Sequence, residues 1–368
     1  MKTALKLTAA LLLLAALYLT LWPVAVKPVA WDSPPPQPFE GEFAVNTRLS
    51  DLELLPIGGY HGPEDLVVKT EQGREILYTT SQDGVIIRVD PEARTSSVFA
   101  NTGGKPLGIE LDGQGNFVIA DAYKGLLWIA ADGSQQITLT DSYQNKPIAY
   151  ADDLAIARTG VIYFSDASTK FGAQAAGSTM AASLFEISEH GKTGRILSYD
   201  PETGRTALIA DNYSFANGVA MCPDDSCILV NETGEYSVDK IYVTGPRAGE
   251  VEPLVPNLPG FPDNINPGAM IDGKQTYWLG LAAPRNAQLD AVAQKPFLRA
   301  LSFRLPKALQ LKAEPYGCVI QIDEDGKILQ TLQDPSGAYR VTTGAIEGAQ
   351  HLYITSLEAK TLGRLPYP

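Results

Sequence analysis

One sequence phrase recurs six times between residue 60 and the C-terminus, and it constrains the fold more than any other feature. Each copy opens with small or acidic residues, continues as an apolar strand and a turn, and then forms a second strand rich in Tyr, Ile, Val and Phe. The copies follow one another at about 45 residues, a period typical of β-propeller blades. The six openings are residues 62–68, 105–109, 150–154, 215–219, 261–265 and 341–345.

This repeat predicts an all-β fold, a six-bladed β-propeller in which each opening begins the innermost strand of a blade. The 33 glycines and 26 prolines of the chain suit short strands joined by tight turns. The sixth copy lacks a strand at its C-terminal end. We expect residues 49–55 to supply that strand, which would close the ring and leave no open sheet edge.

Two insertions interrupt the repeat, at about residues 167–195 and 284–315. The first is rich in Ala, Gly and Ser. The second mixes leucines and phenylalanines with lysines and arginines, so part of it is a candidate amphipathic helix. We expect a lid that packs on the propeller, and the alternative is a membrane-facing or substrate-gating surface.

The N-terminus begins with an apolar segment that follows Lys2 and Lys6. From residue 7 to residue 26 it is about 20 residues long, near the length that spans a bilayer. This length, and the lack of a clean Ala-x-Ala site after it, favour an uncleaved transmembrane or signal-anchor helix over residues 1–26 rather than a cleaved signal peptide. Since the lysines precede the segment, the globular part is expected outside the cytoplasm, on the periplasmic or extracellular side.

Proline-rich residues 27–41 are expected to form an extended spacer between the anchor and a propeller domain at 42–368. The net charge of −13 disfavours nucleic acid as a partner. Cys222 and Cys227 flank a turn between two apolar runs, where they would face each other across a hairpin. They would either form a disulfide in an oxidising compartment or remain half-buried thiols.

Oxygen-bearing side chains recur where the innermost strands begin. Because these strands converge at one mouth of the central channel, the side chains are expected to meet and to bind Ca²⁺, which takes six to eight oxygen ligands. Taken singly, each residue is also a common turn residue. The expected metal ligands are Glu64, Asp152, Asn217, Asp263 and Asn264. The corresponding positions in the other two copies are Leu107 and Thr342.

A second set of residues is offset by one position and consists of Asp65, Asp153 and the carbonyl of Ile109. It would hold a second, more buried cation, or its acids would simply cap backbone amides at the strand starts. His61 lies just before Glu64. It is expected to be structural or exposed at the surface, and the alternative is that its side chain reaches the channel mouth.

Several of these phrases resemble the strictosidine synthase-like family of calcium-dependent six-bladed propellers, and more distantly paraoxonases and gluconolactonases. Within that family the chain looks most like the adipocyte plasma membrane-associated protein group, which also begins with a membrane anchor. The resemblance covers nearly all of residues 45–368 and implies that Glu64, Asn217, Asp263 and Asn264 ligate calcium, whereas relatives commonly carry Asn at position 152. The phrases that carry it include 106–109, 120–126, 153–154, 163–166, 217–219 and 259–265.

Two departures bear on the activity that the resemblance implies. A glutamate of strictosidine synthases aligns with Thr343, and a histidine of paraoxonases aligns with Leu107, so neither of those two mechanisms is expected. The expected function is a calcium-dependent hydrolase of small-molecule esters or lactones, with Asp263 or Asp152 as the base that takes a proton from water. The alternative is a non-catalytic, membrane-anchored propeller that binds a partner, with structural calcium.

Overall fold

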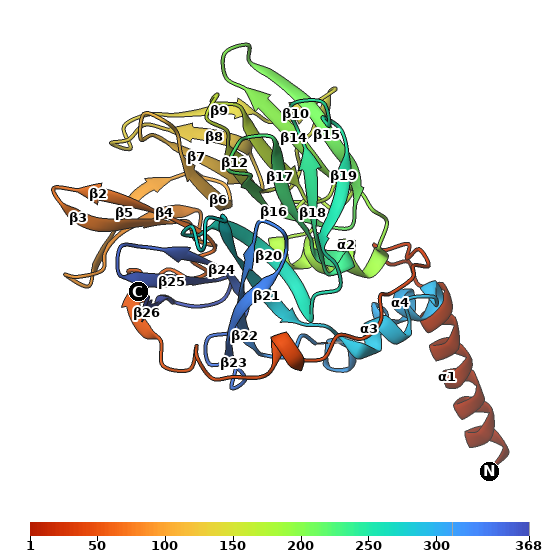
Figure 1. Ribbon diagram of the computed structural model, residues 1–368. Helices are drawn as coiled ribbons and strands as arrows, with labels where there is room; N and C mark the ends of the chain where they lie inside the picture. The colour runs from red at the N-terminus through yellow and green to blue at the C-terminus, as the bar shows by residue number, and fades with distance from the viewer. Residues whose placement is uncertain (311, 368) are drawn as a thin grey trace.

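The computed structural model describes residues 1–310 and 312–367, and these form a six-bladed β-propeller (Figure 1). Each blade is a four-stranded antiparallel sheet, and in the first five blades the innermost strand comes first in the chain. A two-stranded ribbon, β10 (Ser142–Tyr143) and β11 (Lys146–Pro147), follows the second blade. Five blades are continuous in sequence, and they are β2 (Leu66–Glu71), β3 (Arg74–Thr79), β4 (Val85–Asp90), β5 (Thr95–Asn101); β6 (Pro106–Leu111), β7 (Phe117–Asp121), β8 (Gly125–Ile129), β9 (Gln136–Thr140); β12 (Ala151–Ile156), β13 (Ile162–Asp166), β14 (Gly194–Asp200), β15 (Arg205–Tyr213); β16 (Ala216–Met221), β17 (Cys227–Glu232), β18 (Ser237–Tyr242), β19 (Val251–Val255); and β20 (Gly260–Pro267), β21 (Thr276–Pro284), β22 (Gly317–Asp323), β23 (Ile328–Asp334).

The sixth blade joins the two ends of the propeller. Its strands β24 (Thr342–Glu347), β25 (His351–Ser356) and β26 (Thr361–Pro366) are completed by β1 (Glu53–Pro56), which pairs antiparallel with β26. The expected closure by the N-terminal strand is therefore confirmed, although the strand begins later than residue 49. Closure satisfies the edge of β26 and ties residues that are about 300 positions apart in the sequence.

The hydrophobic core lies between neighbouring blades. Alternate residues of each strand point to opposite faces of the sheet, so every blade contributes to two such clusters. Val67 and Ile76 of the first blade, for example, pack with Ile109 and Ile119 of the second. This arrangement buries apolar side chains all round the ring and leaves the axis to the first residues of the inner strands.

Three helices and a 3₁₀ turn form the lid over one mouth of the channel. They are α2 (Thr179–Glu189), α3 (Ala287–Ala291), α4 (Pro296–Ser302) and η3 (Lys307–Leu309). Ser178 caps α2 by accepting a hydrogen bond from the Ala181 amide. Part of the second insertion is helical, as expected, but it forms two short helices, because Pro296 starts a new helix there. The helix α2 lies in the first insertion, whose Ala, Gly and Ser-rich composition does not predict a helix.

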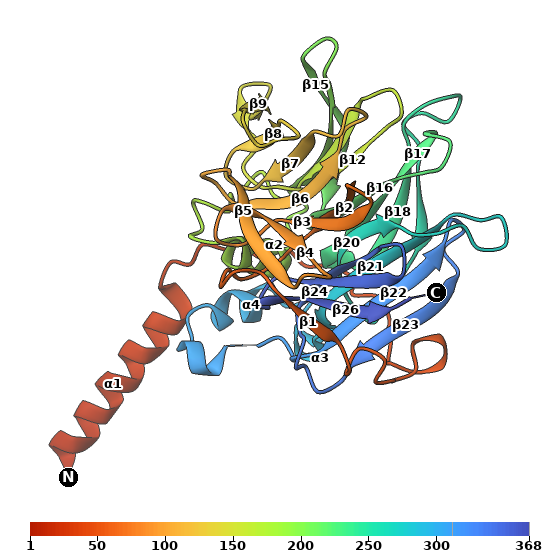
Figure 2. The ribbon, with the colours of Figure 1, turned by 90° about the vertical axis from the view of Figure 1, so that its left-hand side faces the viewer.

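The apolar N-terminus forms the helix α1 (Lys2–Leu21), which projects away from the propeller on the side of α3 and α4 (Figures 1 and 2). It is long and apolar enough to cross a membrane. The proline-rich segment after it is extended, but it does not stand free as a spacer would. Trp31 and Phe43 are buried in the core, and Arg285 donates hydrogen bonds to the carbonyls of Pro34 and Pro35. The 3₁₀ turn η1 (Gly41–Phe43) follows.

Cys222 and Cys227 form a disulfide across the turn between β16 and β17. We expect Cys222→Ser to lower the free energy of unfolding by about 2 kcal/mol, because the bond closes a short loop and so removes little entropy from the unfolded chain. Urea unfolding measures this, with and without dithiothreitol. Dithiothreitol should destabilise the wild type and leave Cys222→Ser unchanged; equal stability of the two oxidised proteins would contradict the prediction.

Candidate functional site

The polar residues at the axis sit in backbone irregularities that recur from blade to blade. The pairing of the inner strand with its neighbour shifts register between residues 106 and 109, 151 and 154, 216 and 219, 262 and 265, and 342 and 345. Two residues lie inside each shift. Such a bulge breaks the alternation of the strand and re-aims side chains, and here it places Asp152, Asn217, Asp263 and Asn264 at the axis.

This register corrects one position of the sequence repeat. Thr342 pairs with Ser356 as Ala151 pairs with Asp166, so Thr343 is the residue equivalent to Asp152. The hydroxyl of Thr342 accepts a hydrogen bond from the amide of Cys318, which lies on β22 of the neighbouring fifth blade. Thr343 instead donates to the backbone carbonyl of Glu64 in the first blade.

Glycine follows the axis residue in several bulges because the neighbouring blade leaves no room for a side chain. A Cβ at Gly218 would lie 2.5 Å from the carbonyl oxygen of Asp263, and one at Gly108 would lie 2.6 Å from the Asp153 carboxylate. The inner strands therefore contact one another directly, which fixes the positions of the side chains that they carry.

Two amides connect the expected ligands across blades. Asn217 Nδ2 donates to Asp263 Oδ1 at 2.8 Å, and Asn264 Nδ2 donates to Glu64 Oε1 at 2.8 Å. Because the amide nitrogens of Asn217 and Asn264 make these bonds, the amide oxygens of both residues remain without a hydrogen-bond donor. Within the described residues, four buried oxygens of the set accept no hydrogen bond, and they are Glu64 Oε2, Asp152 Oδ2, Asn217 Oδ1 and Asn264 Oδ1.

The three acids of this set crowd together in a buried place. Burial, and after it the charges of Asp263 and other acids, raises the pKa of Glu64 well above its usual range. Burial and then Asp263 likewise raise the pKa of Asp152. Burial raises the pKa of Asp263 to about 7, although the hydrogen bond from Asn217 opposes the shift. In the described chain no Lys, Arg or His forms an ion pair with any of them.

Unpaired buried acceptors are costly, and a cation satisfies several of them at once. Histidine, cysteine and carboxylate side chains alone form no cluster of three suited to a metal within residues 1–310 and 312–367. A cation here would therefore also need the amide oxygens of Asn217 and Asn264. Oxygen-only ligands of this kind fit a hard cation such as Ca²⁺.

The second predicted set binds backbone amides. Asp153 accepts hydrogen bonds from the amides of Leu154 and Val219, both at 2.8 Å, and Asp65 accepts one from the amide of Ile109 at 3.1 Å. Since Val219 and Ile109 belong to the next blade in each case, these acids join adjacent inner strands. This supports the capping alternative for Asp65 and Asp153 and uses the amide of Ile109, not its carbonyl.

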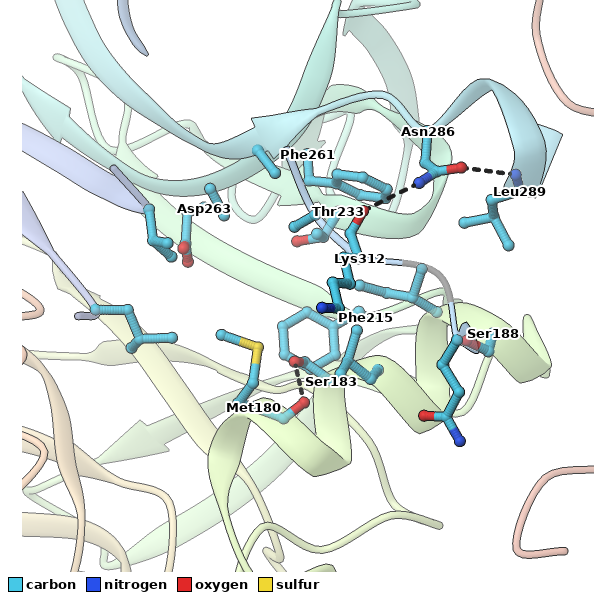
Figure 3. A pocket seen from close by; sticks show the side chains of 18 of the residues that line it. Met180, Ser183, Ser188, Phe215, Thr233, Phe261, Asp263, Asn286, Leu289 and Lys312 are labelled. Carbon is cyan, nitrogen blue, oxygen red and sulfur yellow. Dashed lines mark hydrogen bonds between the residues drawn. The ribbon is translucent and has the colours of Figure 1, made fainter. Parts of the chain in front are cut away.

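A cavity of about 670 Å³ lies above the axis residues (Figure 3). Glu64, Asp152, Asn217 and Asp263 contribute to its polar end, whereas Asn264 is fully buried below. Most of the remaining lining is apolar and comes from the propeller mouth and the lid, and it includes Leu107, Tyr150, Phe215, Phe261, Leu184, Ile187, Leu289, Val292 and Phe303.

Sequence reasoning missed several residues of this site. Thr233 lines the cavity from the 3₁₀ turn η2 (Thr233–Glu235), where its hydroxyl accepts from Asn217 and donates to the Pro262 carbonyl. Asn231 donates to the carbonyl of Asp263 at 2.6 Å. Asn231 lies near the end of β17 and Thr233 directly after it, so polar residues at the end of an apolar second strand were the available signal.

The histidines do not reach the axis. His61 is half exposed and pairs with Asp83 at 2.8 Å, so it does not line the cavity. His190 is buried at the end of α2, where it stacks on Trp31 and pairs with Glu235 at 2.9 Å. It holds the N-terminal segment and the lid to the fourth blade.

Comparison with known sequences identifies relatives over most of the chain. Residues 152–246 match the family model of strictosidine synthase, and residues 41–89 match that of strictosidine synthase-like proteins, N-terminal. Strictosidine synthase-like protein 13 of Arabidopsis thaliana is 31% identical over 332 residues, covering 86% of this chain and 77% of the relative. Adipocyte plasma membrane-associated protein of Rattus norvegicus is 30% identical over 377 residues, covering 96% of this chain and 95% of the relative.

Solved structures of the same architecture are more distant in sequence. A gluconolactonase of Xanthomonas campestris superposes with a TM-score of 0.60 at 18% identity, covering 92% of this chain and 97% of the other. The calcium-binding protein regucalcin of Agrobacterium tumefaciens gives a TM-score of 0.57 at 11% identity, covering 85% and 93%. These structures share the fold, and the sequence relatives establish that the chain belongs to the strictosidine synthase-like family.

Proposed function

We propose that this protein is a calcium-dependent hydrolase of small-molecule esters or lactones. The observation that carries the proposal is the set of four buried, unpaired oxygens from four blades, three at the polar end of an otherwise apolar cavity and that of Asn264 below it. The gluconolactonase and the calcium-binding protein with the same fold are consistent with it.

Glu64, Asp152, Asn217, Asp263 and Asn264 would hold the cation. A bound Ca²⁺ would act as a Lewis acid toward a carbonyl oxygen. The amide hydrogen bonds from Asn217 and Asn264 orient the carboxylates of Asp263 and Glu64, so the ligand oxygens are held in place before any substrate enters. Such preorganisation is the usual contribution of a protein to catalysis at a charged site.

The side chains of the cavity would divide the remaining tasks. Asp263, or Asp152, would take a proton from the attacking water, since both line the cavity. The rings of Phe215 and Phe261 line the same cavity as Asp263 (Figure 3) and would contact the apolar part of the substrate. The lid would exclude bulk water.

Chelation should abolish hydrolysis, and calcium should restore it. Asp263→Asn should lower kcat/KM by about 100-fold or more, the usual loss when a general base is removed. The assay is hydrolysis of phenyl acetate and of a lactone panel by the full chain in detergent. Asp132→Asn, in an exposed turn of the second blade, is the control and should retain full activity. If calcium-loaded protein hydrolyses no ester or lactone, the proposal fails.

We further propose that α1 is an uncleaved membrane anchor and that the propeller lies outside the cytoplasm. The lysines at positions 2 and 6 precede the apolar helix, which orients it by the positive-inside rule. The Cys222–Cys227 disulfide supports an oxidising compartment. The adipocyte plasma membrane-associated relative, whose name places it at a membrane, matches over 95% of its length.

A further inference from the structure

The rim of the cavity carries large apolar side chains that remain exposed. Four of them line the cavity and come from α2, α4 and η3, and a fifth neighbours them on α4. They are Met180, Leu184, Leu298, Leu309 and Phe297, with exposed fractions of 36%, 52%, 40%, 67% and 54%. A large contiguous apolar patch that is exposed to solvent marks an interaction site.

The same part of the lid is basic, in contrast to the rest of the molecule. Residues 286–312 contain five basic residues, Lys295, Arg299, Arg304, Lys307 and Lys312, and one acidic residue, Asp290, in a chain of net charge −13. Lys295 and Lys307 are exposed and form no ion pair within the described chain. Apolar side chains flanked by lysines are typical of surfaces that lie on anionic lipid headgroups.

The end of the anchor helix is fixed to this part of the lid. Arg304 Nε donates to the carbonyl of Trp22, the residue after α1, at 2.6 Å. Val26 is buried, and with Val24 it packs in the cluster that contains Phe303. The contacts leave no free linker between α1 and the lid, so a membrane that holds α1 must lie close to the lid.

Buried Arg299 also connects the N-terminal segment to the lid. Its guanidinium donates to the carbonyl of Ser188 in α2 at 3.0 Å, to that of Ala293 between α3 and α4 at 3.0 Å, and to that of Val29 in the N-terminal segment. Three segments that are distant in sequence are thereby joined by one side chain. Both views of the ribbon show α1 leaving the molecule on the side of α4 (Figures 1 and 2).

We propose that this lid face, formed by Met180, Leu184, Phe297, Leu298 and Leu309 with Lys295 and Lys307, docks on the anionic surface of the bilayer that holds α1. In this orientation the cavity mouth faces the membrane. The proposal rests on the anchor assignment made above and does not depend on any hydrolase activity.

The test uses the full chain in lipid nanodiscs that hold one copy each. A bimane fluorophore is attached at Leu309→Cys, and its quenching by nitroxide-labelled lipid is measured in discs of phosphatidylcholine with 30% phosphatidylglycerol. The matched control is Met270→Cys. Met270 is 58% exposed and lies between β20 and β21, at the end of the fifth blade away from the lid.

We expect quenching at position 309 to exceed that at position 270 by at least threefold. It should fall by half or more in phosphatidylcholine alone, and also when Lys295→Glu and Lys307→Glu are combined. Equal quenching at the two positions would overturn the proposal. So would quenching at position 309 that stays the same both without phosphatidylglycerol and with the two Lys→Glu substitutions.

Other outcomes separate the anchor from the docking. A chain that does not co-elute with the discs would overturn both assignments. A chain that co-elutes without quenching at 309 overturns the docking alone. If bimane at 309 instead becomes protected only when two copies associate in detergent, a second copy covers this face and the proposal is wrong.

Discussion

Chelation of divalent cations is expected to lower the unfolding temperature of this propeller by about 6 °C. A cation present at about a thousand times its Kd stabilises the folded state by about 4 kcal/mol. Unfolding of a domain of this size has an entropy of about 0.7 kcal/mol/K, which converts that loss into the temperature shift. The physical source is the group of buried oxygens at Glu64, Asp152, Asn217 and Asn264, which lack protein donors.

Thermal melting of wild type, Asp263→Ala and Asp132→Asn, each with and without chelator, measures this effect. Asp263→Ala should melt below the calcium-loaded wild type and should respond little to the chelator. Asp132→Asn should behave as the wild type. An unfolding temperature of the wild type that does not change with chelator would show that no cation binds at the axis. A chelator-dependent temperature without hydrolysis of any substrate would favour the partner-binding propeller with structural calcium.

Asp153→Ala is expected to lower the free energy of unfolding by about 3–5 kcal/mol, with or without chelator. The buried carboxylate accepts hydrogen bonds from the amides of Leu154 and Val219, and each bond to a charged group contributes about 1.5–3 kcal/mol. Alanine would leave both amides buried without an acceptor. The loss arises from backbone capping between the third and fourth blades and so does not require a cation.

Denaturant unfolding of Asp153→Ala and of its neighbour Asp152→Ala makes a matched comparison. Both acids lie in the same bulge of β12, but only Asp153 accepts backbone amides, while Asp152 has an unpaired buried oxygen. We expect the destabilisation of Asp152→Ala to depend on calcium and that of Asp153→Ala to be unaffected by it. If the effect of Asp153→Ala disappeared in chelator, a second cation would be the better explanation.

The ring of blades was predictable because the repeat encodes it locally. Strand, turn and strand recur with a fixed spacing, and only a ring buries both faces of each sheet. Closure by a strand near residue 53 followed from the missing strand at the C-terminus. The assignment failed by one residue at Thr342, where the sequence contains no acid to mark the bulge and only the pairing with Ser356 fixes the register.

The lid was the least predictable part. Its helices are short, and they depend on contacts with distant segments more than on their own sequence. Trp31, His190 and Glu235 meet from three regions of the chain, and Arg299 joins two of these regions, the N-terminal segment and α2, to the second insertion. Tertiary contacts of this kind override local propensity.

For this protein, then, the sequence alone determined the architecture, the apolar N-terminal helix and the oxygen-bearing residues at the axis, because each is encoded in local pattern or periodicity. Only the tertiary structure decided how those oxygens are used. It paired the amide nitrogen of Asn217 with Asp263 and that of Asn264 with Glu64, and it left the amide oxygens of both asparagines unpaired. It also showed that Asp153 accepts hydrogen bonds from backbone amides. The reason is geometric: which donor meets which acceptor depends on the packing of one blade against the next, and no single segment of the sequence contains that information.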